Sequence, residues 1–199
     1  FILPAILFFL VYLLLLRLTA NDRLSAKVNA IACGLLVVLG YDLVDYRTVL
    51  SYLSGTNSPD YFLLWARPVN PILGAIFLFS FLLLVFALIQ KTAYRKSTIL
   101  GAGVFLAFMI GSYFFSWGIA VSVLAMLVLF FLFRKEYALS GTLALVVPIG
   151  ALFASPYWYS MWQASKSPWY ESSVLRSGLF YTHYPLLNKF LLATLVVYL

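Results

Sequence analysis

Long apolar runs separated by short polar stretches dominate this 199-residue chain. A helix needs about 20 mostly apolar residues to cross a bilayer, and most of these runs approach that length. The pattern therefore predicts an all-α integral membrane fold of about seven transmembrane helices, the last one truncated, joined on one side by interfacial loops. The runs cover 1–16, 28–44, 71–90, 98–115, 117–133, 137–154 and 186–199.

The stretch 98–133 is too long for a single span. Its middle, 111–118, reads GSYFFSWG, and the Gly-Ser and Trp-Gly pairs are typical of a break in a helix. We therefore expect two helices joined by a tight turn there.

Composition supports a membrane protein. The chain is 64% hydrophobic and 10% charged, whereas soluble domains average about half apolar and about a quarter charged. It begins with Phe1 and stops inside an apolar run, so we expect 1–199 to be a single transmembrane domain from a longer polytopic protein. The single cysteine, Cys33, excludes a disulfide framework within the chain and is expected to be a packing residue.

Charge predicts the orientation. The short loops 17–27, 91–96 and 134–136 hold eight of the 13 basic residues. Short basic loops face the cytoplasm, so we expect these three there, in a multi-pass protein of the cell membrane. The alternate loops, about 42–70 and 155–185, would then face outward, away from the cytoplasm. This explains the net charge of +7 without nucleic acid as a partner.

Polar and aromatic residues gather on the predicted outer side. All five tryptophans and four of the six acids lie there. An anchoring belt alone would place aromatic residues at both interfaces, yet the predicted inner side carries no tryptophan. We therefore expect the chemistry on the outer face.

Asp42 and Asp45 form an acidic motif beside Arg47 at the outer end of the second run. Residues three apart share one helix face, so both carboxylates could point the same way. They could bind a divalent cation or orient a sugar hydroxyl, or Asp45 could pair with an arginine while Asp42 caps a helix. Two acids do not complete a metal site by themselves.

Arg67 lies between Trp65 and Pro68 at the predicted interface. Its guanidinium could bind a phosphate in bidentate fashion. It could equally reach the lipid headgroups from the edge of the apolar layer.

The loop 155–185 opens with SPYWYSMWQ, which predicts a short interfacial helix whose aromatic rings lie at headgroup level. The rest of the loop combines cations, aromatic rings, an acid and the single histidine, which indicates either a binding role or plain anchoring. Lys166 and Arg176 could bind a lipid-linked phosphate, Trp169 and Tyr170 could stack on a sugar, and Glu171 could accept hydroxyl hydrogen bonds. His183 could contact the sugar or lipid, although a lone histidine is more often structural.

Three stretches resemble polytopic glycosyltransferases of the GT-C superfamily, which includes protein O-mannosyltransferases, aminoarabinose transferases and oligosaccharyltransferase catalytic subunits. They are ARPVNPILGAIFLFSFLLL at 66–84, GAGVFLAFMIGSYFFSWGIA at 101–120 and the segment 155–191, which begins SPYWYSMWQASKSPWYESS. P-loop, Rossmann, serine-hydrolase and HExxH motifs are absent from the sequence.

The resemblance implies an outward-facing active site, a polyprenyl-phosphate-linked sugar donor and an inverting transfer. It also implies a catalytic acid in the family's first outer loop, which we expect to lie upstream of Phe1, so that 1–199 alone would be inactive. The motif here is Asp-x-x-Asp instead of the Asp-x-Asp or Asp-x-x-Glu of metal-using members, so metal dependence stays open. Arg67, Lys166 or Arg176 would stabilise the departing lipid phosphate.

Two other classes of function compete with the enzyme. A transporter or flippase for lipid-linked saccharides would favour charges at the membrane midplane, broken helices and internal repeats. The sequence offers only Pro148 and Gly150 in that direction. A purely structural membrane subunit would need no polar groups at the outer boundary.

Overall fold

The computed structural model is helical throughout the residues that it describes, and these contain no strand. The chain divides into two compact units, Phe1–Ser155 and Pro156–Leu199. The described residues are 2–19, 24–39, 50–51, 53–56, 72–90, 95–112 and 114–170.

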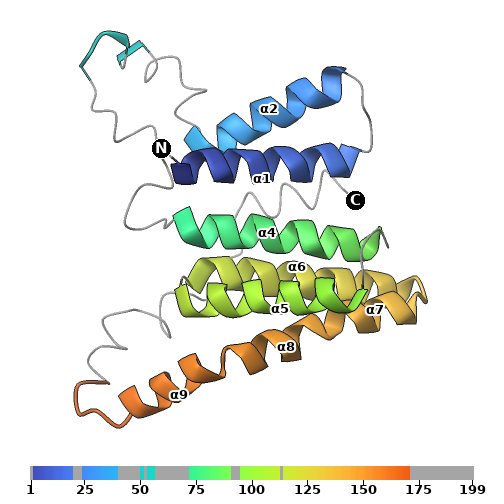
Figure 1. Ribbon diagram of the computed structural model, residues 1–199, viewed down its shortest axis with the longest axis vertical. Coiled ribbons are helices and arrows are strands. Elements are labelled where there is room, and N and C mark those ends of the chain that lie inside the picture. Colours follow the sequence, from blue (N-terminus) through green and yellow to red (C-terminus); the bar gives the residue numbers. More distant parts are fainter. Residues whose placement is uncertain are drawn as a thin grey trace, which may run out of the picture. The chain divides into compact units, whose positions relative to one another are not determined.

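The described residues of the first unit form three helical hairpins (Figure 1). In each of them two consecutive helices pack against one another across a short connection. The helices α1, α4 and α6 therefore run in one direction, and their partners α2, α5 and α7 run back. The hairpins are α1 (Ile2–Thr19) with α2 (Leu24–Leu39), α4 (Ile72–Ile89) with α5 (Arg95–Ser112), and α6 (Phe114–Phe133) with α7 (Tyr137–Ala144).

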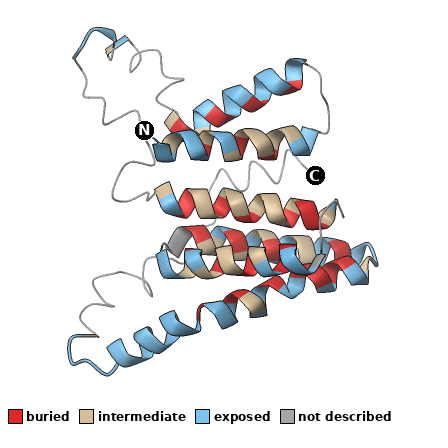
Figure 2. Cartoon of the chain, in the orientation of Figure 1, coloured by how far each residue is buried: buried red, intermediate tan, exposed pale blue. Residues whose placement is uncertain are grey.

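Helix α4 joins the hairpins, because it packs against α1 on one side and against α5 and α6 on the other. Helix α8 (Val146–Phe153) continues from α7 and packs along α5. Figure 2 shows the buried residues on the faces that these helices turn toward each other. Phe81, Leu106, Leu124 and Leu143 are buried in the larger core cluster, and Leu7 is buried in the smaller one between α1, α2 and α4.

Small residues bring α5 and α8 into close contact. A Cβ added to Gly103 would collide with the side chain of Ile149 and lie 3.2 Å from the backbone nitrogen of Gly150. A Cβ on Gly150 would lie 2.7 Å from a methyl carbon of Leu106. Lipid tails are as apolar as a leucine side chain, so close van der Waals packing of this kind holds helices together in a bilayer.

The described helices confirm a helical membrane protein, but they do not confirm the predicted number of seven spans. Among the described residues, three helices are long and apolar enough to cross a membrane: Ile2–Thr19, Ile72–Ile89 and Ser116–Phe133. A fourth span results if Tyr137–Phe153 and Ser155–Ala164 are taken together. Helix α2 has 16 residues and is about 24 Å long, short of the roughly 30 Å of bilayer hydrocarbon. The seven-span count stays a prediction, and its last run lies outside the described residues.

The structure confirms one detail of the sequence prediction and changes three others. The break in 98–133 is confirmed, since α5 ends at Ser112 and α6 begins at Phe114. Its Trp-Gly portion is wrong, because α6 continues through 117–118. The run 137–154 divides into α7 and α8 at Leu145. Cys33 is exposed on α2, so its burial gives no support to the predicted packing role.

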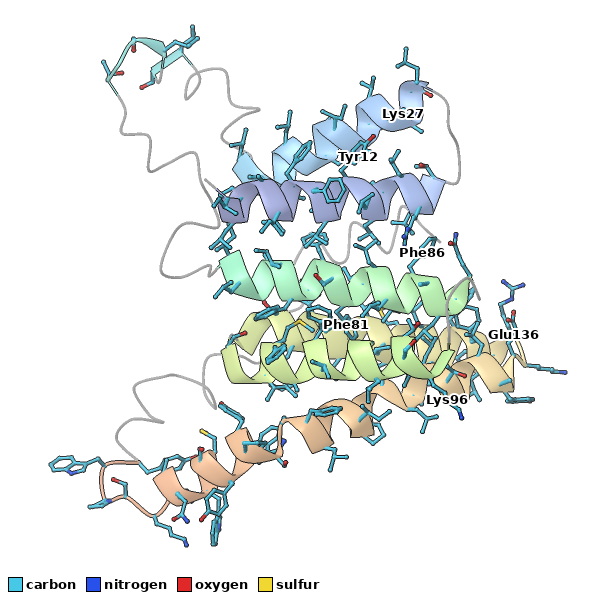
Figure 3. All side chains as sticks on the ribbon, viewed as in Figure 1. Tyr12, Lys27, Phe81, Phe86, Lys96 and Glu136 are labelled. Atoms are coloured by element: carbon cyan, nitrogen blue, oxygen red, sulfur yellow. The ribbon has the colours of Figure 1, made fainter. Side chains whose placement is uncertain are left out.

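Charged residues mark one end of the first unit. Figure 3 shows Lys27, Lys96 and Glu136 at the same end of their helices, where the three hairpins turn, with Lys27 apart from the other two. Within α1 to α8, every charged residue that the structure describes lies at these turns, and the opposite helix ends carry none. The predicted gathering of basic loops at one end is therefore present, while its cytoplasmic location stays a prediction. These residues are Arg17, Lys27, Arg95, Lys96, Arg134, Lys135 and Glu136.

Candidate interfacial binding site

Helix α9 (Ser155–Ala164) opens the predicted outer loop 155–185 and confirms the short helix predicted there. Pro156 lies in the first turn, where a missing backbone N–H costs nothing. The Ser160 hydroxyl donates to the Pro156 carbonyl over 3.0 Å. No residue of α9 is buried, although it carries four aromatic side chains.

One face of α9 gathers two aromatic rings and an amide. Tyr159, Trp162 and Gln163 are three and four residues apart, which places them on one side of the helix, and Lys166 follows in the turn after it. The Tyr159 and Trp162 ring centroids lie 6.0 Å apart. The Gln163 amide nitrogen donates to the Tyr159 hydroxyl over 2.8 Å.

Lys166 is held against this face. Its ammonium nitrogen lies 3.4 Å from the centroid of the Trp162 ring, a close cation–π contact. The ammonium has three N–H donors and a ring occupies only one side of it, so it keeps donors for an anionic oxygen. The contact therefore places a positive charge beside an exposed aromatic surface.

The segment after α9 is ordered by its own backbone. The N–H groups of Lys166, Ser167 and Tyr170 donate to the carbonyls of Gln163, Ala164 and Ser167 at 3.2, 3.0 and 3.0 Å. These bonds fix the chain direction as it leaves the helix. They set Trp169 outward, where 76% of the residue is exposed, and leave Tyr170 half-buried.

The arrangement suits a ligand with an anionic head and a flat or ring-shaped neighbour. A phosphate would pair with the ammonium of Lys166, and an exposed indole such as Trp169 could cover the apolar face of a sugar. Tryptophan and tyrosine also favour the membrane–water boundary, because one end of each ring is apolar and the other is polar.

Only part of the predicted site can be located. Lys166, Trp169 and Tyr170 lie within six residues of the end of α9. The close contact of Lys166 with Trp162 was missed, although their four-residue spacing in the sequence could have indicated it. The predicted residues outside the described part of the chain are Asp42, Asp45, Arg67, Glu171, Arg176 and His183.

A metal site finds no support in the part of the chain that is described. Across 2–19, 24–39, 50–51, 53–56, 72–90, 95–112 and 114–170, the structure brings together no group of three or more His, Cys, Asp or Glu side chains. The carboxylates of Asp42 and Asp45 fall outside these ranges, so the predicted cation site stays a hypothesis.

No known protein family, curated protein or solved structure matches this chain. The resemblance to GT-C glycosyltransferases therefore rests on the three sequence stretches alone. The chemistry of α9 and of the turn that follows it is the structural basis for a proposed function.

Proposed function

We propose that this chain belongs to a multi-pass membrane glycosyltransferase of the GT-C type. The enzyme transfers a sugar from a polyprenyl-phosphate-linked donor to an acceptor on the extracytoplasmic face. The proposal includes seven membrane-spanning helices, with α9 and the turn after it at the donor site. The observation that carries it is the exposed cluster in which Lys166 stacks on Trp162, close in sequence to Trp169.

The nature of the donor supports this location. A polyprenyl-phosphate sugar has an apolar tail, an anionic linker and a polar ring, so its site must lie at a bilayer boundary. Helix α9 follows the apolar helix α8 directly, and its aromatic side chains are typical of the headgroup layer. A cation in that layer meets the phosphate of a donor whose tail stays in the lipid.

The transfer requires a base and a stabilised leaving group. An acceptor nucleophile attacks the anomeric carbon while a carboxylate takes its proton, and the bond from that carbon to the phosphate oxygen breaks. The departing phosphate keeps the electron pair, and Lys166 would stabilise the resulting charge, alone or with Arg67 or Arg176. Glu171, Tyr170 and His183 would contact the sugar.

The principal test measures transfer from radiolabelled polyprenyl-phosphate sugars in membranes that contain the full-length protein, whose wild type must show measurable transfer. We expect Lys166→Gln to lower kcat/KM by about 10- to 100-fold, since charge stabilisation of a leaving group is lost. Lys27→Gln, which removes a cation from the hairpin turn of α1 and α2, is the matched control and should leave transfer unchanged. Equal activity of the wild type and Lys166→Gln would refute the assignment of the donor phosphate to this residue.

A flippase for lipid-linked saccharides is the second candidate. It is favoured by the interruption of the helix between α7 and α8. The Ile149 amide donates to the Leu145 carbonyl over a long 3.4 Å, and Pro148 has no N–H to donate. Discontinuous helices are common in transporters. Movement of labelled lipid across the bilayer without sugar transfer would favour this function over the enzyme.

A further inference from the structure

The charged end of the first unit takes no part in the proposed donor site. Of its basic side chains, Arg17, Lys27, Lys96, Arg134 and Lys135 are all exposed. The acid that the structure describes at this end is Glu136, and it already pairs with Arg134, with 3.5 Å between Arg134 Nε and Glu136 Oε1. The described surface here therefore carries a strong excess of positive charge.

Two backbone hydrogen bonds close the turn from α6 to α7 on this surface. The Lys135 N–H donates to the Leu132 carbonyl at 3.0 Å, and the Glu136 N–H donates to the Phe131 carbonyl at 2.9 Å. This is the Schellman pattern that closes the end of a helix. These two bonds restrain the backbone of the turn, which lowers the conformational entropy lost when a ligand binds to it.

Lys135 occupies the position of this turn that favours glycine. Its φ is 60°, in the left-handed region that side chains with a Cβ rarely adopt. Glycine is the usual residue there because it adopts the conformation without strain. The sequence instead places a lysine at the tip of the turn, which favours a binding role for its positive charge.

An exposed aromatic ring lies beside Arg134, and a second exposed phenylalanine precedes it in the sequence. The guanidinium carbon of Arg134 lies 5.6 Å from the Phe130 ring centroid. Phe130 is 51% exposed and Phe133 is 81% exposed. A soluble phosphate would gain nothing from these rings, whereas a phospholipid offers both an anionic head for the cations and acyl chains for the rings.

We propose that the α6–α7 turn binds an anionic phospholipid. Lys135 and Arg134 contact its phosphate, and its acyl chains lie against Phe130 and Phe133. Lys96, at the start of α5, adds to the positive potential at the same end (Figure 3). The site is independent of the donor site on α9 and would hold in the transporter as well.

The test places the purified protein in nanodiscs of phosphatidylcholine alone or of an equal mixture with phosphatidylglycerol. The readouts are the midpoint of thermal unfolding and the affinity for phosphatidylglycerol by native mass spectrometry. We expect phosphatidylglycerol to raise the midpoint of the wild type. Each cation removed at the turn should weaken lipid binding by about fivefold.

Lys135→Gly gives a signature in two directions. It relieves the left-handed strain and should raise the midpoint in phosphatidylcholine, yet it should reduce the gain from phosphatidylglycerol. Lys135→Asn is the second variant, because asparagine tolerates a positive φ and is uncharged. Lys27→Gln, which removes an exposed cation from the α1–α2 turn instead of the α6–α7 turn, is the matched control and should keep the full gain.

Two results would overturn the proposal. One is an undiminished phosphatidylglycerol gain in the double variant R134Q/K135G. The other is an equal gain from soluble glycerol phosphate added to phosphatidylcholine nanodiscs, which would assign the site to a free phosphate and not to a lipid. A gain that needs the lipid and the two cations supports it.

Discussion

Helices α4 and α9 are both rich in large apolar or aromatic residues, yet they differ completely in burial. Helix α4 buries residues along its whole length, among them Phe81 and Val85, because α1, α5 and α6 surround it. Helix α9 buries none. Packing within the protein therefore accounts for the apolar side chains of α4, but not for the aromatic side chains of α9 in the described chain.

The side-chain types agree with this difference. Helix α4 contains aliphatic residues, phenylalanine and small residues, with Ser80 as its sole polar side chain. Helix α9 contains tyrosine and tryptophan, which combine a large ring with a hydrogen-bonding group. The first composition suits a dry interior, and the second suits the boundary between lipid and water. Helix α9 is therefore the better candidate of the two for contacting a ligand at the membrane surface.

The largest effect on the free energy of unfolding is expected where α5 and α8 pack most closely. Gly103→Ala should lower the free energy of unfolding by about 1–3 kcal/mol, because the added methyl collides with Ile149 and the backbone of α8 cannot move away freely. Gly118→Ala is the matched control, since no atom lies within 4 Å of its added Cβ. Reversible unfolding in bicelles measures both. Equal stabilities of the two variants would show that α5 and α8 do not pack closely.

A smaller loss is expected at a hydrogen bond between helices. The buried Ser140 of α7 donates to the Val128 carbonyl of α6 at 3.0 Å. Ser140→Ala should cost about 0.6 kcal/mol and at most about 1.7, the range for such bonds in membranes. In the control Ser122→Ala, the hydroxyl that is lost bonds only within its own helix, to Gly118. The same unfolding assay should separate the two, and a larger loss in the control would contradict the packing.

The smallest effect on stability is expected in α9. Trp158→Ala should change the free energy of unfolding by less than about 0.5 kcal/mol, because the side chain is exposed. Quenching of Trp158 fluorescence by brominated lipids, in a protein with its other tryptophans replaced by phenylalanine, reports its depth. We expect quenching greatest for labels near the headgroup. No quenching at any depth would remove α9 from the membrane interface.

The sequence predicted the helices better than their contacts. The runs 1–16, 71–90 and 117–133 correspond to α1, α4 and α6 within a few residues, because continuous apolar stretches leave little ambiguity. The fit of Gly103 against α8 and the bond from Ser140 to α6 could not be predicted, since both depend on which helices become neighbours.

The candidate site was predictable in part for the same reason. The pairing of Lys166 with Trp162 is local and follows from a four-residue spacing on a helix. Any convergence of this cluster with Asp42, Arg67 or Arg176 depends on contacts between distant segments. Local patterns in a single sequence do not determine such contacts.

The distribution of basic loops in the sequence predicts that α9 and the basic hairpin turns face opposite sides of the membrane. The most direct measurement replaces Cys33 by alanine and then introduces Ala164→Cys at the end of α9 or Lys135→Cys at the α6–α7 turn. Intact cells are treated with a maleimide that cannot cross membranes. We expect labelling of Ala164→Cys in intact cells and of Lys135→Cys only after the membrane is opened. Labelling of both from the same side would contradict it.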